Sequence, residues 1–128
     1  EWLHGGGRVD TTHERGGVSG LTLLMVAARS GHERVVELLS RRSADVNLQT
    51  SDGGTALMWA AFNGHERVVD LLLRHCAEVN QQDSDGNTAL MYAAVFNRPA
   101  VVWRLLRAGA ATAARSASGK TALQLAKE

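Results

Sequence analysis

The chain has 128 residues, of which 45% are hydrophobic and 21% charged, and this composition is ordinary for a single globular domain. Its formal net charge is +1, so the chain as a whole is neither strongly basic nor strongly acidic. No apolar stretch approaches the roughly 18 residues that cross a bilayer, so we predict no membrane insertion. The single cysteine, Cys76, excludes a disulfide within these residues, and we therefore predict an intracellular protein, cytoplasmic or nuclear.

Residues 1–19 form a glycine-rich stretch without a helical or strand period. Trp2 and Leu3 precede three glycines at positions 5–7, and polar residues follow. Glycine runs favour turns and loops, so we predict an irregular loop for this segment.

From Gly20 onwards a threonine recurs every 33 residues, and each one precedes a short, alanine-rich apolar stretch. The four are Thr22, Thr55, Thr88 and Thr121. A threonine hydroxyl accepts a hydrogen bond from a free amide of the first helical turn, so each is a predicted helix N-cap. A constant period of this length predicts a repeat array.

A second helix is predicted in each unit. The first helix is expected to end at Ser30-Gly31 in one unit and at Asn63-Gly64 in the next. Valines and leucines recur at helical spacing in residues 35–39 and 68–72, and residues 97–106 are a looser third copy. Each unit therefore contains two antiparallel helices. Tight turns are predicted between the units at the dipeptides 52–53 and 85–86, which are both Asp-Gly.

These residues resemble the ankyrin repeat, whose unit carries the motifs G-x-T-P-L-H-x-A-A, G-H-x-x-V-V-x-L-L-L and G-A-D-V-N. The resemblance covers about residues 20–128 and implies one domain, residues 1–128, with an all-α solenoid fold of stacked helix-turn-helix units and hairpin-like loops. The implied divisions are 1–19, the tail of a preceding or capping repeat with its irregular loop; the full repeats 20–51, 52–84 and 85–117; and 118–128, a partial C-terminal repeat.

The chain departs from the family pattern at the glycine that ends the second helix. Ser43 and Cys76 replace it in the first two full units, and it returns only at Gly109. If the left-handed backbone is kept, each replacement costs on the order of 1 kcal/mol.

No catalytic or metal-binding constellation is found, so we predict that the protein is not an enzyme and has no cofactor. Residues 119–121 end like a phosphate-binding loop, but Ala114 stands where its first glycine belongs. His32 and His65 begin copies of the zinc-protease motif H-E-x-x-H, but valine replaces the second histidine of both. Cys76 is expected to be a structural thiol.

The leading functional hypothesis is a protein-protein interaction module. In ankyrin proteins the first helices and hairpin tips form a concave surface that binds other proteins. The candidate partner-binding residues are Ser51, Asp52, Ser84 and Asp85 at the tips, Trp59, Phe62, Tyr92 and Phe96 at or near the first helices, and Trp103. The alternative for Trp59 and Tyr92 is a place in the core between repeats. The partner is expected to be another protein or peptide, and the oligomeric state stays open.

Trp103 falls where the other units have Glu37 and Asp70, and Arg104 falls where they have leucine. An exposed and a buried role are therefore expected to be exchanged here. We predict that Trp103 packs against a missing segment, a neighbouring chain or the stem of Arg107, with simple exposure as the alternative.

Two other functions stay open. In the first, the array is an accessory or targeting domain of a multidomain enzyme or channel. In the second, the basic C-terminal part of the array binds nucleic acid or an acidic partner. Residues 98–128 hold six basic and one acidic side chain, against eight and twelve in residues 1–97. A solvated face is the simpler explanation of such charge, so nucleic acid is not the expected partner.

Asn47 and Asn80 each follow an acidic residue and a valine. The pattern resembles the family sites that an asparaginyl hydroxylase modifies, so both are candidate hydroxylation sites. The alternative is a loop asparagine that bonds only to its own turn.

Overall fold

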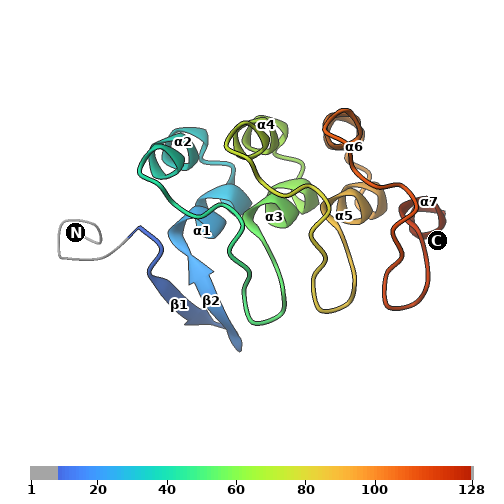
Figure 1. The fold of residues 1–128 in the computed structure, drawn as a ribbon, viewed down its shortest axis with the longest axis horizontal. Coiled ribbons are helices and arrows are strands. Elements are labelled where there is room, and N and C mark those ends of the chain that lie inside the picture. The colour runs from blue at the N-terminus through green and yellow to red at the C-terminus, as the bar shows by residue number, and fades with distance from the viewer. Residues whose placement is uncertain (1–8, 128) are drawn as a thin grey trace.

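The computed structural model describes residues 9–127, which form a row of helix pairs joined by long loops (Figure 1). Two strands come first, β1 (Thr12–Arg15) and β2 (Val18–Thr22). The helices are α1 (Leu23–Ser30), α2 (Glu33–Arg41), α3 (Ala56–Phe62), α4 (Glu66–Arg74), α5 (Ala89–Val95), α6 (Pro99–Arg107) and α7 (Ala122–Ala126).

Threonine caps begin the first helix of every unit, as the sequence predicts. The Oγ1 atom accepts a hydrogen bond from the backbone N–H three residues later, at 3.1 Å for Thr22, 3.2 Å for Thr55 and 3.3 Å for Thr88 and Thr121. Thr22, Thr55 and Thr88 are buried, so the cap supplies a partner to an amide that water does not reach.

The helices lie in two layers (Figure 1). The inner row consists of α1, α3, α5 and α7, and the outer row of α2, α4 and α6; each helix packs on the next helix of its row, and each outer helix packs on the inner helix that precedes it. Ala28, Ala60, Ala61 and Ala93 have no exposed surface, and their small side chains let the inner helices approach closely.

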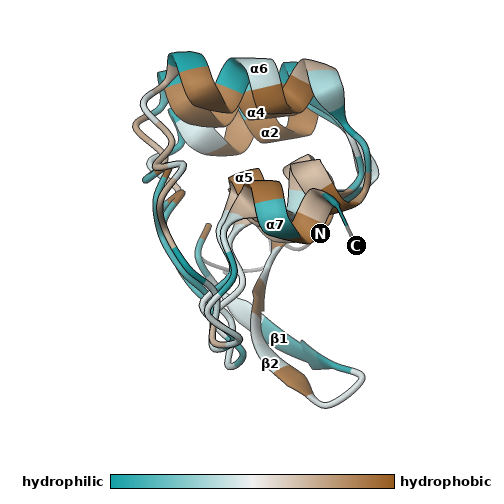
Figure 2. Ribbon diagram, turned by 90° about the vertical axis from the view of Figure 1, so that its right-hand side faces the viewer, coloured by the Kyte–Doolittle hydropathy of each residue, from teal (hydrophilic) through white to brown (hydrophobic). Residues whose placement is uncertain are grey.

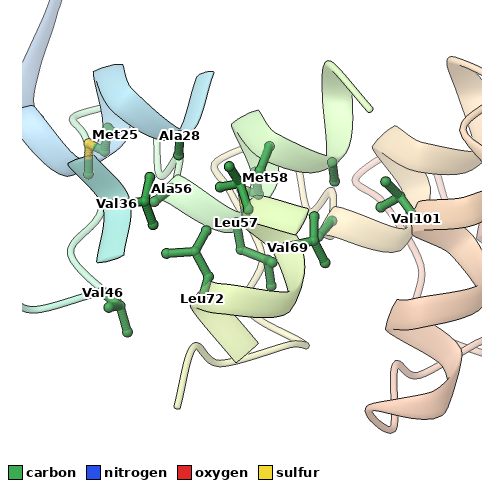
Figure 3. Close-up of a cluster of buried hydrophobic side chains, with 14 of the residues drawn as sticks. Met25, Ala28, Val36, Val46, Ala56, Leu57, Met58, Val69, Leu72 and Val101 are labelled. Carbon is green, nitrogen blue, oxygen red and sulfur yellow. The ribbon is translucent and has the colours of Figure 1, made fainter. Parts of the chain in front are cut away.

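The core lies between the two rows and runs the length of the array. Leu39, Leu72 and Leu105, from the outer helices, are at most 1% exposed. Figure 3 shows Leu57 of α3 and Leu72 of α4 within this cluster. Every unit therefore buries its apolar face against its neighbours, which is the basis of stability in stacked repeats.

The loops between units end in tight turns at the far side from the outer helices (Figure 1). Gly53 N–H donates to the Thr50 carbonyl and Gly86 N–H to the Asp83 carbonyl, both at 2.9 Å. The two glycines have φ angles of 83° and 75°, the left-handed backbone that such turns require.

Each turn is also bonded to the turn of the next unit. Ser84 N–H donates to the Asp52 carbonyl at 3.0 Å, and Ala117 N–H donates to the Asp85 carbonyl at 2.7 Å. At the start of the row, Ser51 N–H donates to the Ser19 carbonyl at 2.8 Å. The turns thus form a continuous, hydrogen-bonded edge beside the inner helices.

The all-α prediction is wrong for residues 12–22, where the expected irregular loop is an antiparallel hairpin of β1 and β2. Strand β2 continues the row of turns, because Ser19 pairs with Ser51 of the first loop. In Figure 2 the hairpin starts beside the loops and extends away from them, below the inner helices. The residues of β1 are polar and exposed, so the segment lacks the apolar alternation that marks a strand. The tail expected at Trp2 and Leu3 lies outside the described residues.

The predicted left-handed backbone is present where serine and cysteine replace glycine. Ser43 has a φ angle of 67° and Cys76 one of 69°. In both units the next amide completes the helix end, with Ala44 N–H donating to the Leu39 carbonyl and Ala77 N–H to the Leu72 carbonyl. The strain expected at Ser43 and Cys76 therefore exists in the folded chain.

Candidate functional site

Aromatic side chains from two successive units meet at the ends of the inner helices α3 and α5. The rings of Phe62 and Phe96 are stacked, with centroids 4.1 Å apart and planes inclined by 28°. Tyr92 lies 6.0 Å from Phe62, centroid to centroid. The 33-residue period therefore places these side chains in one cluster rather than in separate units.

The cluster is anchored in the core but keeps exposed surface. Trp59 and Tyr92 are half-buried and pack against the core, and Phe62 is half-buried beside them. Phe96 is 42% exposed. Trp59 and Tyr92 are thus partly buried and partly exposed, and the cluster leaves aromatic surface accessible.

A small hollow lies where α3 and α5 meet the loop turns. Its volume is about 110 Å³, and it is lined by Asp52, Gly54, Met58, Trp59, Phe62, Asp83 and Tyr92. Four of the residues predicted for partner binding, Asp52, Trp59, Phe62 and Tyr92, are brought together here. The other tip residues, Ser51, Ser84 and Asp85, are exposed and do not line the hollow.

Asp83 is the residue of this site that sequence reasoning missed. Its Oδ1 atom accepts hydrogen bonds from the N–H groups of Asp85, at 3.0 Å, and Asn87, at 2.9 Å. Its Oδ2 atom accepts a hydrogen bond from the Tyr92 hydroxyl. The signal that could have found it is its place at the first position of an Asp-x-Asp-Gly turn, where a carboxylate accepts from the turn amides.

The Tyr92 hydroxyl is held as a donor. Burial raises the pKa of Tyr92 to about 12, and the hydrogen bond to Asp83 adds to the increase. Asn87 Nδ2 donates to the same hydroxyl at 3.5 Å and acts in the opposite direction. Asp52 is fixed in a similar way, because its Oδ1 atom accepts from the Thr50 hydroxyl and from Gly54 N–H.

Trp103 lies apart from this cluster, on the outer helix α6, and is 62% exposed. Its neighbour Arg104 turns towards the preceding unit instead. Arg104 Nε lies 2.9 Å from both carboxylate oxygens of Asp70, and Nη2 lies 3.4 Å from Glu66 Oε1. These contacts raise the pKa of Arg104, chiefly through the hydrogen bond to Asp70. The packing predicted for Trp103 stays a prediction.

Asn47 and Asn80 connect successive units. Asn47 Oδ1 accepts from Glu78 N–H at 2.6 Å, and its Nδ2 donates to the Cys76 carbonyl at 3.3 Å. Asn80 makes the equivalent bonds one unit later, with Ala111 N–H at 2.7 Å and the Gly109 carbonyl at 3.4 Å. The alternative in which each asparagine bonds only to its own turn is therefore wrong, because the partners lie in the next unit.

Three of the six basic side chains near the C-terminal end, those of Arg98, Arg104 and Arg115, have partners within the chain. Arg98 Nε donates to the Phe62 carbonyl at 3.1 Å, Arg104 pairs with Asp70, and Arg115 donates to the Gly119 carbonyl at 2.8 Å. Each of these guanidinium groups is directed to a partner within the chain.

Within residues 9–127, no group of three or more His, Cys, Asp or Glu side chains is placed to hold a metal ion. No helix in the same part of the chain is long and apolar enough to cross a membrane.

A family model described as ankyrin repeats (three copies) matches the chain over residues 1–83 and again over residues 24–116. A search of the curated proteins finds no match.

Proposed function

The chain belongs to the ankyrin repeat family, and from that membership we propose that it is a non-catalytic module that binds another protein or peptide on its concave face. We define the concave face as the surface where α3 and α5 meet the loop turns, made by Asp52, Trp59, Phe62, Asp83, Tyr92 and Phe96. Ankyrin repeats generally mediate protein-protein interaction, and typically they are not enzymes.

The observation that carries the proposal is the partly exposed aromatic cluster. Phe96 is 42% exposed yet stacked on Phe62, and Trp59 and Tyr92 are supported by the core. Aromatic side chains with fixed positions bind a partner at low entropic cost and are frequent hot spots of interfaces. The exposed Ser51, Ser84 and Asp85 lie on the turns next to Asp52 and Asp83, and in this proposal they form part of the polar rim of the interface.

Nucleic acid is the weaker candidate partner. Arg98, Arg104 and Arg115 are engaged with groups of the chain itself, so fewer cations are available to phosphates than the composition suggests. A cytoplasmic or nuclear location remains part of the proposal. Cys76 is a free, exposed thiol, which is compatible with a reducing compartment.

The proposal is tested by affinity capture with matched variants. Phe96→Ser removes an exposed aromatic side chain from the concave face, and Trp103→Ser removes a more exposed one, 62% against 42%, from the outer row. We expect Phe96→Ser to weaken binding of the captured protein by about 2 kcal/mol, as for a hot-spot aromatic, and Trp103→Ser to leave it unchanged. Thermal unfolding followed by circular dichroism verifies that both variants fold.

The opposite pattern, normal capture by Phe96→Ser and loss with Trp103→Ser, would move the interface to the outer helices. Captured proteins are identified by mass spectrometry and then tested by direct titration with each variant, so that indirect partners are separated from direct ones.

A further inference from the structure

The hollow of the concave face is lined by negatively charged side chains. Asp52 and Asp83 line the hollow, and Asp85 lies on the same turn as Asp83. The ion pairs that Arg41, Arg67, His75 and Arg104 form within residues 9–127 all end on carboxylates of the outer helices instead.

The outer row of helices is organised in the opposite way. Asp70 and Glu66 of α4 pair with Arg104 of α6, and Glu37 of α2 pairs with Arg41. Carboxylates of the outer row are therefore matched with cations, both between α4 and α6 and within α2. Where the inner helices meet the turns, the contacts described for Asp52 and Asp83 are with neutral donors.

The carboxylates of the hollow are held in place by neutral donors. Asp83 accepts from two backbone N–H groups and the Tyr92 hydroxyl. Asp52 accepts from the Thr50 hydroxyl and Gly54 N–H, and both bonds end on Oδ1. An ionised carboxylate offers about four acceptor sites, so each of the two retains capacity for a further donor. These bonds position the charge without cancelling it.

The walls of the hollow are aromatic. Trp59, Phe62 and Tyr92 line it together with Met58. The faces of aromatic rings attract cations, and their apolar area packs against a methylene stem. A volume of about 110 Å³ suits the end of one side chain and not a helix.

We propose that the partner anchors to this hollow with a lysine or arginine side chain from a basic segment, its stem against Trp59 and Tyr92 and its charge on Asp52 and Asp83. This inference rests on the proposed function, since it names what the concave face binds. A neutral or acidic anchor would cover the two carboxylates and leave them without a compensating charge, which is unfavourable.

The test uses a random-peptide display library, which favours no charge in advance, and the whole chain as bait. Selected peptides are synthesised, their affinities are measured by fluorescence anisotropy, and their contact surface is mapped by backbone amide chemical shifts. Each peptide is then titrated with Asp52→Asn, Asp83→Asn and Glu33→Gln. Glu33→Gln removes the same single charge from the outer helix α2 and is the matched control.

We expect selected peptides to share a lysine or arginine at one position, and to shift amides of the loop turns and of α3 and α5. We expect Asp52→Asn and Asp83→Asn each to weaken binding by about tenfold, and Glu33→Gln to change it less than about twofold, because only the first two change the charge at the anchor. Replacement of the shared basic residue by norleucine, which keeps the stem, should cost the wild-type complex about as much as Asp52→Asn.

Peptides that map to the concave face but lack a shared basic residue, or that are insensitive to both aspartate changes, would overturn this inference and leave the proposed function intact. Equal weakening by Glu33→Gln would also overturn it, because net charge and not the hollow would then be responsible. Peptides that map only to the outer helices, or a library without binders, would count against both proposals.

Discussion

The Tyr92 hydroxyl donates a hydrogen bond to Oδ2 of Asp83, nine residues earlier in the chain. The bond joins the inner helix α5 to the turn that precedes it, and both residues belong to the concave face. Burial together with this bond raises the pKa of Tyr92 from 10.0 to about 12. Tyr92 is also the single tyrosine of the sequence, so its ionisation can be followed without interference from another phenol.

We predict that phenolate absorbance of the folded protein rises with a midpoint near pH 12 and that Asp83→Asn lowers this midpoint. Because the pKa of Tyr92 is higher in the folded than in the unfolded chain, its neutral hydroxyl stabilises the folded chain. This contribution to the free energy of unfolding is fully present below about pH 10 and is lost as pH rises through about 12. Urea unfolding at a series of alkaline pH values should show this loss in the wild type, and Tyr92→Phe should lack that part of it. An ordinary tyrosine midpoint, with circular dichroism showing a folded chain, would contradict the buried hydrogen bond.

The turn glycines are predicted to differ in how well they tolerate a side chain. Gly53 and Gly119 hold equivalent places and similar φ angles, 83° and 80°. A Cβ at Gly53 would lie 2.7 Å from the Cα of Asp83 in the next turn, whereas nothing lies within 4 Å of one at Gly119. Gly119→Ala should therefore cost about 1–2 kcal/mol for the backbone conformation alone, and Gly53→Ala clearly more. Chemical denaturation of both variants measures the difference, and equal losses would show that the turns are not in close contact.

Ser43 and Cys76 offer sites where the protein can be stabilised. Both have a left-handed backbone, and Gly109 has the corresponding place in the third unit with a φ angle of 92°. Ser43→Gly and Cys76→Gly are each expected to raise the free energy of unfolding by about 1 kcal/mol, because glycine adopts this backbone without a steric penalty. Ser43→Ala is the control, since it removes the hydroxyl but keeps the Cβ, and it should bring no such gain. Thermal and urea unfolding give the comparison.

Asn80 is predicted to contribute to stacking and to be a hydroxylation site. Asn80→Ala leaves Ala111 N–H and the Gly109 carbonyl to water, and because Asn80 is exposed we expect the free energy of unfolding to fall by about 1 kcal/mol.

Incubation with an asparaginyl hydroxylase, followed by intact-mass and peptide analysis, should add one oxygen at Asn80 and one at Asn47. Asn80 should react faster, because Asn47 is half-buried. No added oxygen on either peptide would end the hydroxylation hypothesis.

The sequence by itself determined the repeat architecture, because the signals involved are local. A threonine hydroxyl reaches an amide three residues later, and leucines at helical spacing share one face whatever surrounds them. The resemblance to the ankyrin family, and not a local signal, predicted Trp59, Phe62 and Tyr92 near the turns at Asp52 and Asp85. The same resemblance predicted strain at Ser43 and Cys76, because the family pattern has a left-handed glycine at that point.

Only the tertiary structure decided what joins one unit to the next. The hairpin of β1 and β2 forms where Ser51 offers a backbone partner to Ser19, 32 residues away. Asn47 and Asn80 bond to backbone groups at least 29 residues further along the chain. Asp83 enters the site because a ring in the following helix reaches it.

The exposure of Trp103 and the partner of Arg104 were also decided by the tertiary structure. Arg104 is directed to Asp70, 34 residues earlier, while Trp103 remains 62% exposed. A sequence period shows which positions are equivalent, but the partner of a side chain depends on the surface that the neighbouring unit presents after stacking. Hydrogen bonds and ion pairs between units depend on which groups come close in space when the units stack. The spacing of residues within a single unit does not contain this information.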